Sequence, residues 1–137
     1  MASANLNVVR SIYADFELGD FSSTEWADPE IELVVMDAPE AGTRRGLAAA
    51  GDFWREWLRS WEAYRAQVDE YRQLDDERVL VFGRMAGLGR RTGADVEAAF
   101  ANVVHLRDGK VVKLVMYPNR ESALADLGPS AEPDDNR

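Results

Sequence analysis

Few residues in this 137-residue chain have the types and spacing that chemistry requires. The chain contains one histidine, His105, and no cysteine, so neither thiolate chemistry nor a His/Cys metal site is expected. Asn102 is a polar residue inside the apolar run FANVVHL, which begins at Phe100. Its amide is neutral at every pH and can donate or accept a hydrogen bond. These residues point to a polar anchor more readily than to an acid–base pair.

The charged residues have simpler explanations than catalysis. The pairs Arg44-Arg45 and Arg90-Arg91 could receive an anion, although such pairs are more often solvated loop residues. The short Gly87–Gly89 segment lacks the context of a dinucleotide-binding loop, so no cofactor is expected. Most aspartates are expected in turns or at helix ends, where capping and solvation account for them: Asp15, Asp28, Asp37, Asp69, Asp95 and Asp108.

Composition predicts an ordinary globular protein of one domain. Apolar residues make up 46% and charged residues 30%, which is enough for a real core under a polar surface. A net charge of −9 without a basic stripe argues against nucleic acid as a partner. No apolar run approaches the ~20 residues of a membrane span, and no signal-peptide pattern is present, so a cytoplasmic protein is expected. We expect the domain over residues 1–127 and a disordered acidic tail over 128–137.

The strongest fold signal is a hairpin over residues 100–117, in which two β-branched runs flank Arg107-Asp108-Gly109. A two-residue loop would pair Arg107 with Lys110, and a three-residue loop would pair Leu106 with Lys110. We favour the three-residue loop, because it gathers one nearly apolar face. That inner face would hold Phe100, Asn102, Val104, Leu106, Val112, Leu114 and Met116. The outer face would hold Ala101, Val103, His105, Val111, Lys113, Val115 and Tyr117.

The first third of the chain predicts helices before strands. Apolar residues at helical spacing indicate a helix capped by Asn5 and ended by Gly19. A second, short helix is expected over residues 21–26, stopped by Asp28-Pro29. Alternation then predicts a strand over 31–35 with one buried face, and Pro39 and Gly42 mark a loop over 37–45.

The remainder predicts one long helix and then a sheet. The helix, over residues 47–62, would carry Trp54, Trp57 and Trp61 on one face, either as core or as pocket lining. Glycines 83, 87 and 89 would mark bulges or bends in a strand. The expected strands cover residues 64–74, 79–88, 96–106 and 111–117, and one or two helical turns cover 121–127. Helices followed by a bent antiparallel sheet define an α+β class.

Several segments between residues 8 and 127 together resemble the NTF2-like superfamily, in its SnoaL-like, polyketide cyclase-like branch. They are FELGDF (16–21), WADPEIEL (26–33), TRRG (43–46), FWREWLRSW (53–61), LRDGKVV (106–112) and MYPNRESALADLG (116–128). The resemblance implies a cone, also called a cystatin-like α+β barrel, in which N-terminal helices pack on a strongly curved sheet around a pocket. It also implies a homodimer through the outer sheet face, where the apolar side chains of the hairpin would otherwise be left wet.

The catalytic groups of isomerases in this superfamily can be compared with this sequence position by position. The aspartate base of ketosteroid isomerases falls at Val34 or Val35, neither of which can take a proton. Their oxyanion-hole tyrosine falls near Ile12, one residue from Tyr13. Their protonated aspartate falls at Asn102, which can still donate a hydrogen bond.

Two other sets of catalytic residues known in the superfamily can be compared in the same way. The Asp-Arg-Asp group of limonene-epoxide hydrolases would fall at Met116, Gly83 and Met85, so all three groups are lost. The SnoaL-branch cyclases rely on a pocket aspartate with a nearby histidine, and the one histidine here, His105, is expected on the outer face.

We therefore expect an apolar, aromatic pocket without the usual catalytic carboxylates and without a metal. Its ligand-contacting residues are predicted to be Tyr13, Phe16, Trp54, Trp57, Met85, Asn102, Leu114 and Met116, with Ile12, Leu33, Val35 and Val104 also in the wall. Three functions stay open. The protein could bind a small hydrophobic molecule, with Asn102 as polar anchor and Tyr13 helping to orient a carbonyl or hydroxyl. It could be a cyclase or isomerase with Asn102 as oxyanion donor and a non-standard base, or a dimerisation module without a ligand.

Overall fold

The computed structural model describes residues 2–18, 25–36 and 42–128. In chain order its elements are α1 (Ala2–Glu17), β1 (Ala27–Val35), β2 (Gly42–Arg45), α2 (Leu47–Arg59), β3 (Trp61–Gln73), β4 (Arg78–Gly89), β5 (Asp95–Arg107), β6 (Lys110–Tyr117) and α3 (Arg120–Leu127). The strands form one sheet in the order β2-β1-β6-β5-β4-β3. β1 runs parallel to β6, and the other neighbouring strands are antiparallel.

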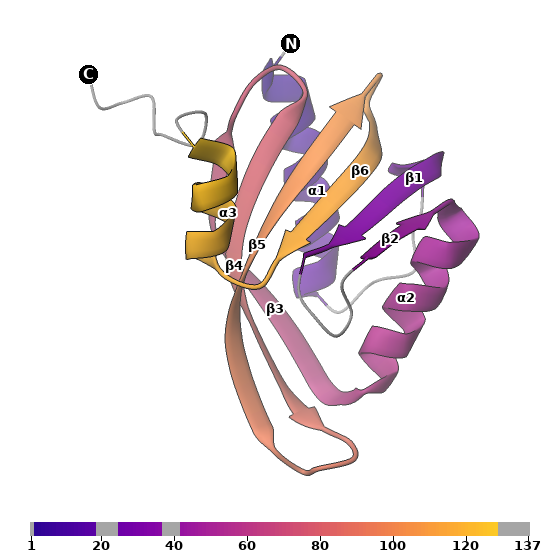
Figure 1. Cartoon of the computed structure of the whole chain (residues 1–137), viewed down its shortest axis with the longest axis vertical. Helices are drawn as coiled ribbons and strands as arrows, with labels where there is room; N and C mark the ends of the chain where they lie inside the picture. Colours follow the sequence, from indigo (N-terminus) through magenta and orange to yellow (C-terminus); the bar gives the residue numbers. More distant parts are fainter. Residues whose placement is uncertain (1, 19–24, 37–41, 129–137) are drawn as a thin grey trace.

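The sheet separates two helical layers, with α1 on one side and α3 on the other (Figure 1). α1 packs on β3 and β4. α2 packs on β1 and β2 at one edge of the sheet and runs directly into β3 at the opposite edge. One helix can reach both edges only if the sheet curves around it, so the predicted α+β cone is confirmed.

Each face of the sheet has its own apolar core. On the inner face, which α1 and α2 cover, Val9 and Ile12 pack with strand residues that include Leu33, Val104 and Leu114. On the outer face, which α3 covers, Ala123 packs on a second cluster of strand residues: Leu80, Phe82, Ala101, Val103, Val115 and Tyr117. The apolar residues predicted on the outer face of the hairpin are therefore largely buried within one chain.

The predicted register of the hairpin is wrong, although most of its faces are right. Arg107 pairs with Lys110, so the loop has two residues, Asp108 and Gly109. Leu106 then pairs with Val111 but His105 pairs with Lys113, which leaves Val112 as an extra residue in a β-bulge. Beyond the bulge, from the His105–Lys113 pair to the open end of the hairpin, side chains lie on the faces that the three-residue loop predicts. Val111 changes sides and lies in the inner core, and Val112, predicted on the inner face, borders a surface depression that His105 also borders.

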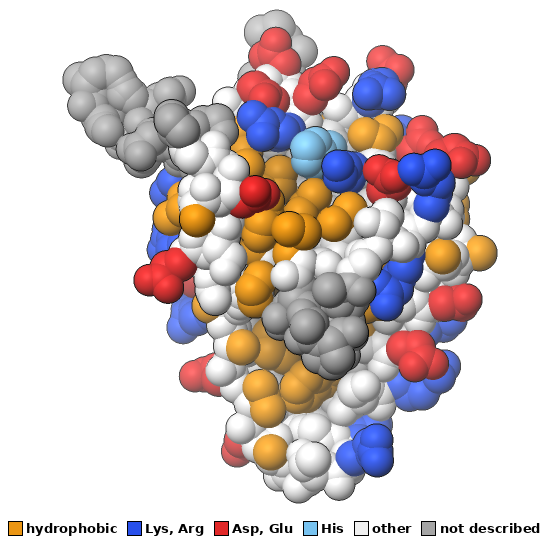
Figure 2. All heavy atoms as spheres, viewed as in Figure 1, with side chains coloured by type: hydrophobic (Ala, Val, Ile, Leu, Met, Phe, Trp, Pro, Cys, Tyr) orange, Lys and Arg blue, Asp and Glu red, His pale blue; other side chains and the backbone are white. Residues whose placement is uncertain are grey.

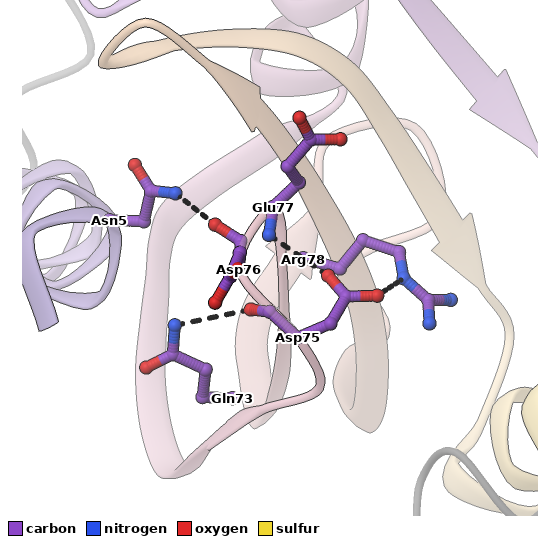
Figure 3. Close-up of polar contacts among 6 residues, drawn as sticks. All are labelled: Asn5, Gln73, Asp75, Asp76, Glu77 and Arg78. Atoms are coloured by element: carbon purple, nitrogen blue, oxygen red, sulfur yellow. Dashed lines mark hydrogen bonds and ion pairs between the residues drawn. The ribbon is translucent and has the colours of Figure 1, made fainter. Parts of the chain in front are cut away.

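The N-terminal region differs from prediction at three places. The first helix begins before Asn5, whose side chain does not cap it but donates to the Asp76 carbonyl at 2.5 Å in the β3–β4 turn (Figure 3). β1 begins at Ala27 and includes Asp28 and Pro29, and of the short helix predicted over 21–26 only the turn at 25–26 lies within the described residues. Part of the predicted loop over 37–45 is strand β2, because it pairs with the far side of β1.

The long helix ends earlier than its tryptophan pattern predicts. α2 stops at Arg59, and Trp61 already belongs to β3. Ala63 has a φ of 55°, and the β3–β4 register shifts between Glu62 and Arg65, so a bulge follows the helix at once. Spacing in the sequence continues across this junction, and it cannot show where the backbone changes direction.

The remaining elements lie close to their predicted positions. Residues Ile31, Leu33 and Val35 are buried along β1, as alternation predicts. α3 is capped by Asn119, whose side chain accepts from the Ser122 amide at 2.8 Å. None of the described helices is long and apolar enough to cross a membrane. The predicted tail over 128–137 lies, apart from Gly128, outside the described residues.

Candidate functional site

A cavity of about 260 Å³ lies between α1, α2 and the inner face of the sheet. The helices supply aromatic side chains to it, and the strands supply mostly apolar ones together with one amide. Its wall consists of Tyr13, Phe16, Val35, Phe53, Trp54, Trp57, Tyr64, Ala66, Met85, Ala98, Ala99, Phe100, Asn102, Met116, Tyr117 and Pro118. Such a wall, apolar with few polar groups, is typical of small-molecule sites.

The structure brings most of the predicted pocket residues to this wall. They are Tyr13, Phe16, Trp54, Trp57, Met85, Asn102 and Met116. Leu114 instead packs in the inner core, where it is 4% exposed, and does not line the cavity. Alternation assigns Leu114 to the correct face, but it does not say how far along the strand the cavity extends. Ile12, Leu33 and Val104 are core residues for the same reason, whereas Val35 borders the cavity.

Four aromatic wall residues were missed, and one of them, Phe100, was assigned to the inner face but not to the pocket. Phe53 precedes the tryptophan stripe and was not counted with it. Tyr64 begins a strand whose alternation is poor, so its direction was ambiguous. Tyr117 was assigned to the outer face, where its side chain packs and donates to Asp126 of α3 at 2.5 Å, yet the residue also borders the cavity.

The polar centre of the cavity is a hydrogen bond between two residues that are 89 positions apart in the chain. Nδ2 of Asn102, on β5, donates to the hydroxyl oxygen of Tyr13, on α1, at 2.8 Å. Both residues are buried, and Asn102 is the buried polar residue among those described. Because the Tyr13 oxygen accepts this bond, the Tyr13 proton can be donated to another group. The pair therefore presents a hydroxyl donor to a molecule in the cavity.

The environment keeps this hydroxyl neutral. Burial raises the pKa of Tyr13 well above its usual range. The hydrogen bond from Asn102 opposes this effect, and the nearby Tyr71 and Tyr64 add to it. A neutral phenol at physiological pH can donate a hydrogen bond but cannot act as a base.

Packed rings hold Tyr13 in place. The ring of Tyr13 meets Phe16 edge to face with centroids 5.3 Å apart, and it stacks on Phe100 at 6.5 Å. Phe16 in turn contacts Trp54 at 6.2 Å, which links α1 to α2 across the cavity wall. Contacts of this kind stabilise by about 0.5–1.5 kcal/mol beyond the area they bury. The wall is therefore fixed by aromatic packing on two helices.

No carboxylate, imidazole, lysine or arginine lines the cavity among the described residues. Val35, at one of the two positions where the isomerase base falls, borders the cavity and cannot titrate. Met85 and Met116, which replace groups of the epoxide hydrolases, also lie in the wall. The arrangement supplies a hydrogen-bond donor without a base beside it.

The one histidine lies on the outer face, as predicted. His105 borders a separate surface depression of about 470 Å³, whose wall mixes acidic and basic side chains such as Glu32, Arg45 and Lys113. Figure 2 shows the histidine beside basic side chains on the face that carries α3. Burial, followed by Lys113 and Arg78, lowers its pKa. Although this depression is larger, it is charged and includes the Glu32–Arg45 ion pair, so it lacks the apolar wall of a small-molecule site.

Within the described residues, no three His, Cys, Asp or Glu side chains are grouped so that they could hold a metal ion. The cavity wall contains no such side chain at all in the described part of the chain.

Comparisons with known proteins agree with this fold. Among solved structures, a candidate SnoaL-like polyketide cyclase from Jannaschia sp. CCS1 has a TM-score of 0.74 at 15% identity, over 96% of this chain and 95% of that one. An NTF2-like protein from Burkholderia thailandensis E264 has a TM-score of 0.74 at 25% identity, over 91% and 98%. TerC, which was co-crystallised with polyporic acid, has a TM-score of 0.71 at 23% identity, over 90% and 97%.

Comparison with curated proteins finds no match. Comparison with family models matches residues 9–114 to the SnoaL-like domain, which confirms the resemblance seen in the sequence. Because this match extends from α1 into β6, the chain belongs to the SnoaL-like domain family.

Proposed function

We propose that this protein binds a small, largely apolar molecule in the inner cavity, and that the Tyr13–Asn102 pair receives a carbonyl or other acceptor oxygen of that molecule. The observation that carries the proposal is the buried 2.8 Å hydrogen bond between these side chains in an otherwise aromatic wall. A buried polar pair costs free energy unless its hydrogen bonds are made, and a ligand acceptor would satisfy the remaining proton.

The cavity supports binding better than proton transfer. Enolisation by an isomerase or cyclase requires a base within hydrogen-bond reach of the reacting carbon. The described wall residues that titrate are tyrosines, and burial raises the pKa of Tyr13 and Tyr64, which keeps both protonated. An enzymatic role would need a base from elsewhere. A dimerisation module without ligand would leave the cavity and its donor without a purpose.

Two matched probes test the proposal. Tetralin and α-tetralone share a two-ring body, but α-tetralone alone carries a carbonyl acceptor. An engineered cavity of about 150 Å³ is enough to bind benzene, so a cavity of about 260 Å³ suits a two-ring probe. Trp54 and Trp57 lie in the wall, so both calorimetry and tryptophan fluorescence can report binding. We expect α-tetralone to bind about five- to tenfold more tightly than tetralin, which corresponds to one hydrogen bond.

Substitutions test which side chains cause the preference for α-tetralone over tetralin. Tyr13→Phe and Asn102→Leu should each remove most of the preference for α-tetralone while leaving tetralin affinity within about twofold. Tyr71→Phe is the matched control, because the Tyr71 ring packs on Tyr13 at 6.5 Å but Tyr71 does not line the cavity. Equal affinity of the wild-type protein for both probes, or a preference that survives both substitutions, would refute the proposed anchor.

We also propose the homodimer that the family resemblance implies. α3 covers much of the outer face, yet hydrophobic side chains remain visible beside it in Figure 2. Sedimentation equilibrium measures the oligomeric state directly, and a monomer at high protein concentration would contradict the proposal.

A further inference from the structure

Three tyrosines line the cavity, and their hydroxyls have different partners. Tyr117 donates its proton to Asp126 of α3, at 2.5 Å, so its hydroxyl is engaged with the outer layer. The Tyr13 oxygen accepts a hydrogen bond from Asn102. The Tyr64 hydroxyl accepts a hydrogen bond from the indole of Trp57, a second wall residue. Two tyrosines of the cavity wall thus each accept a hydrogen bond from a neighbouring donor.

Ring contacts also hold the second pair. The rings of Trp57 and Tyr64 are nearly perpendicular, at 84°, with centroids 6.4 Å apart. Trp61 contacts both, at 5.5 Å from Trp57 and 6.4 Å from Tyr64. Gly87 allows this packing, because a Cβ there would lie 3.0 Å from the Trp61 ring. Tyr64 therefore has a fixed position at the junction of α2 and β3.

Tyr13 and Tyr64 are both residues of the cavity wall. They come from different elements, α1 and β3, and both border the one cavity. Tyr64 is also close enough to raise the pKa of Tyr13. A phenolic hydroxyl has one proton and two lone pairs, so contacts with the protein do not exclude a hydrogen bond to a ligand.

From this arrangement we infer that the ligand carries two separate oxygen functions on an otherwise apolar ring system, one contacted by the Tyr13–Asn102 pair and the other by the Tyr64–Trp57 pair. The inference rests on the proposed function and narrows its ligand class, from a molecule with one acceptor to a dioxygenated one. Two fixed hydroxyls would determine the ligand's orientation, which a single anchor leaves free to rotate.

The test adds a hydroxyl to the α-tetralone probe. A set of hydroxytetralones, with the hydroxyl at each open position of the aromatic ring, covers the spacings that the cavity could select. We expect at least one of them to bind the wild-type protein about three- to tenfold more tightly than α-tetralone. Tyr64→Phe should abolish this gain while changing α-tetralone affinity by less than about twofold. Tyr71→Phe is again the control, and thermal unfolding of each variant verifies that it is folded.

The outcomes separate this inference from the proposed function. If no hydroxytetralone binds more tightly than α-tetralone, the inference is overturned. It is also overturned if Tyr64→Phe weakens all probes by the same factor, since Tyr64 would then only shape the cavity. In both cases the proposed function stands as long as α-tetralone binds more tightly than tetralin and depends on Tyr13. Loss of that preference in the wild-type protein would instead remove the proposed function itself.

Discussion

The two faces of strand β5 carry opposite chemistry within four residues. Asn102 points to the inner face, where it hydrogen-bonds Tyr13 in a wall without charged side chains among the described residues. His105 points to the outer face, where it borders a depression lined by both acids and bases. The one histidine is therefore on the opposite side of the sheet from the cavity.

The difference follows from the cost of burying charge. A carboxylate or ammonium group loses its hydration inside an apolar cavity, and it persists there only if it is paired. The inner face instead uses neutral amide and phenol groups, which one hydrogen bond can satisfy. The depression beside His105 is open to solvent, so ion pairs such as Glu32–Arg45 cost little there and stabilise little. A cavity built this way is suited to holding a neutral molecule.

Asn102→Asp would break this contrast by placing a carboxyl group on the inner face. Burial would raise the pKa of the new carboxyl, so the folded protein would hold its proton to a higher pH than the unfolded chain. Stability relative to wild type is then retained at low pH and lost as pH rises. We expect a loss of about 3 kcal/mol at about pH 8 and little loss near pH ~4. Urea denaturation at both values measures it.

Asn7→Asp is the control for that substitution, because Asn7 is exposed on α1 and should show no such dependence on pH. An equal loss of stability at both pH values in Asn102→Asp would mean that the inner face tolerates charge as well as the outer face does.

Gly83→Ala would sharpen the contrast by testing how tightly the inner wall is built. A Cβ at Gly83 would lie 2.5 Å from the Phe100 ring and 2.5 Å from the Gln67 carbonyl oxygen, so either the ring or the strand must move. We expect a loss of about 2 kcal/mol in unfolding free energy and weaker α-tetralone binding, since Phe100 lines the cavity.

Gly51→Ala provides a comparison with the opposite sign. Gly51 lies within α2, and a Cβ there would approach only the flexible Arg55 side chain, at 3.4 Å. Alanine should stabilise the helix by about 0.5–1 kcal/mol. If Gly83→Ala and Gly51→Ala changed the unfolding free energy in the same direction, the close packing of Phe100 over Gly83 would not explain the effect of the Gly83 substitution.

The smallest effect is expected at His105, on the outer face. Its pKa is lowered from the ordinary value of 6.5, chiefly by burial and then by Lys113 and Arg78, while Asp75 opposes the shift. The unfolded chain therefore binds a proton first as pH falls, and stability decreases from about pH 7 to about pH 5 by under ~1 kcal/mol. His105→Gln should remove this slope in urea denaturation. A slope unchanged in the variant would assign it to carboxylates.

The hairpin illustrates what could be predicted and why the rest could not. Alternation of apolar residues correctly separates Asn102 and Val104 from Val103 and His105, because successive side chains of a strand point to opposite faces. The Asp-Gly cue places the turn correctly, although the loop is one residue shorter than we favoured. The bulge at Val112 was not predictable, since it depends on how β6 pairs with β1 and β5 together.

The candidate site shows the same division. Helical spacing identified Tyr13, Phe16, Trp54 and Trp57 as one-sided apolar positions, and all four line the cavity. Leu114 was wrongly predicted to line the cavity, and Tyr64 was not predicted to line it. The face of the strand to which a side chain points does not determine how far that side chain is from the cavity. The resemblance placed Asn102 at one oxyanion-hole position and Tyr13 one residue from another, but only the structure shows that the two side chains hydrogen-bond.

The sequence by itself determined the α+β class, the order of most elements, the faces of the central strands and the family. These properties are encoded in short-range periodicity and in turn residues, which act over a few positions. Tertiary structure alone decided the hydrogen bond between Tyr13 and Asn102, the limits of the cavity and the covering of the outer face by α3. Each of these depends on where helices dock on a curved sheet, and that docking is set by the packing of side chains that are distant in the chain.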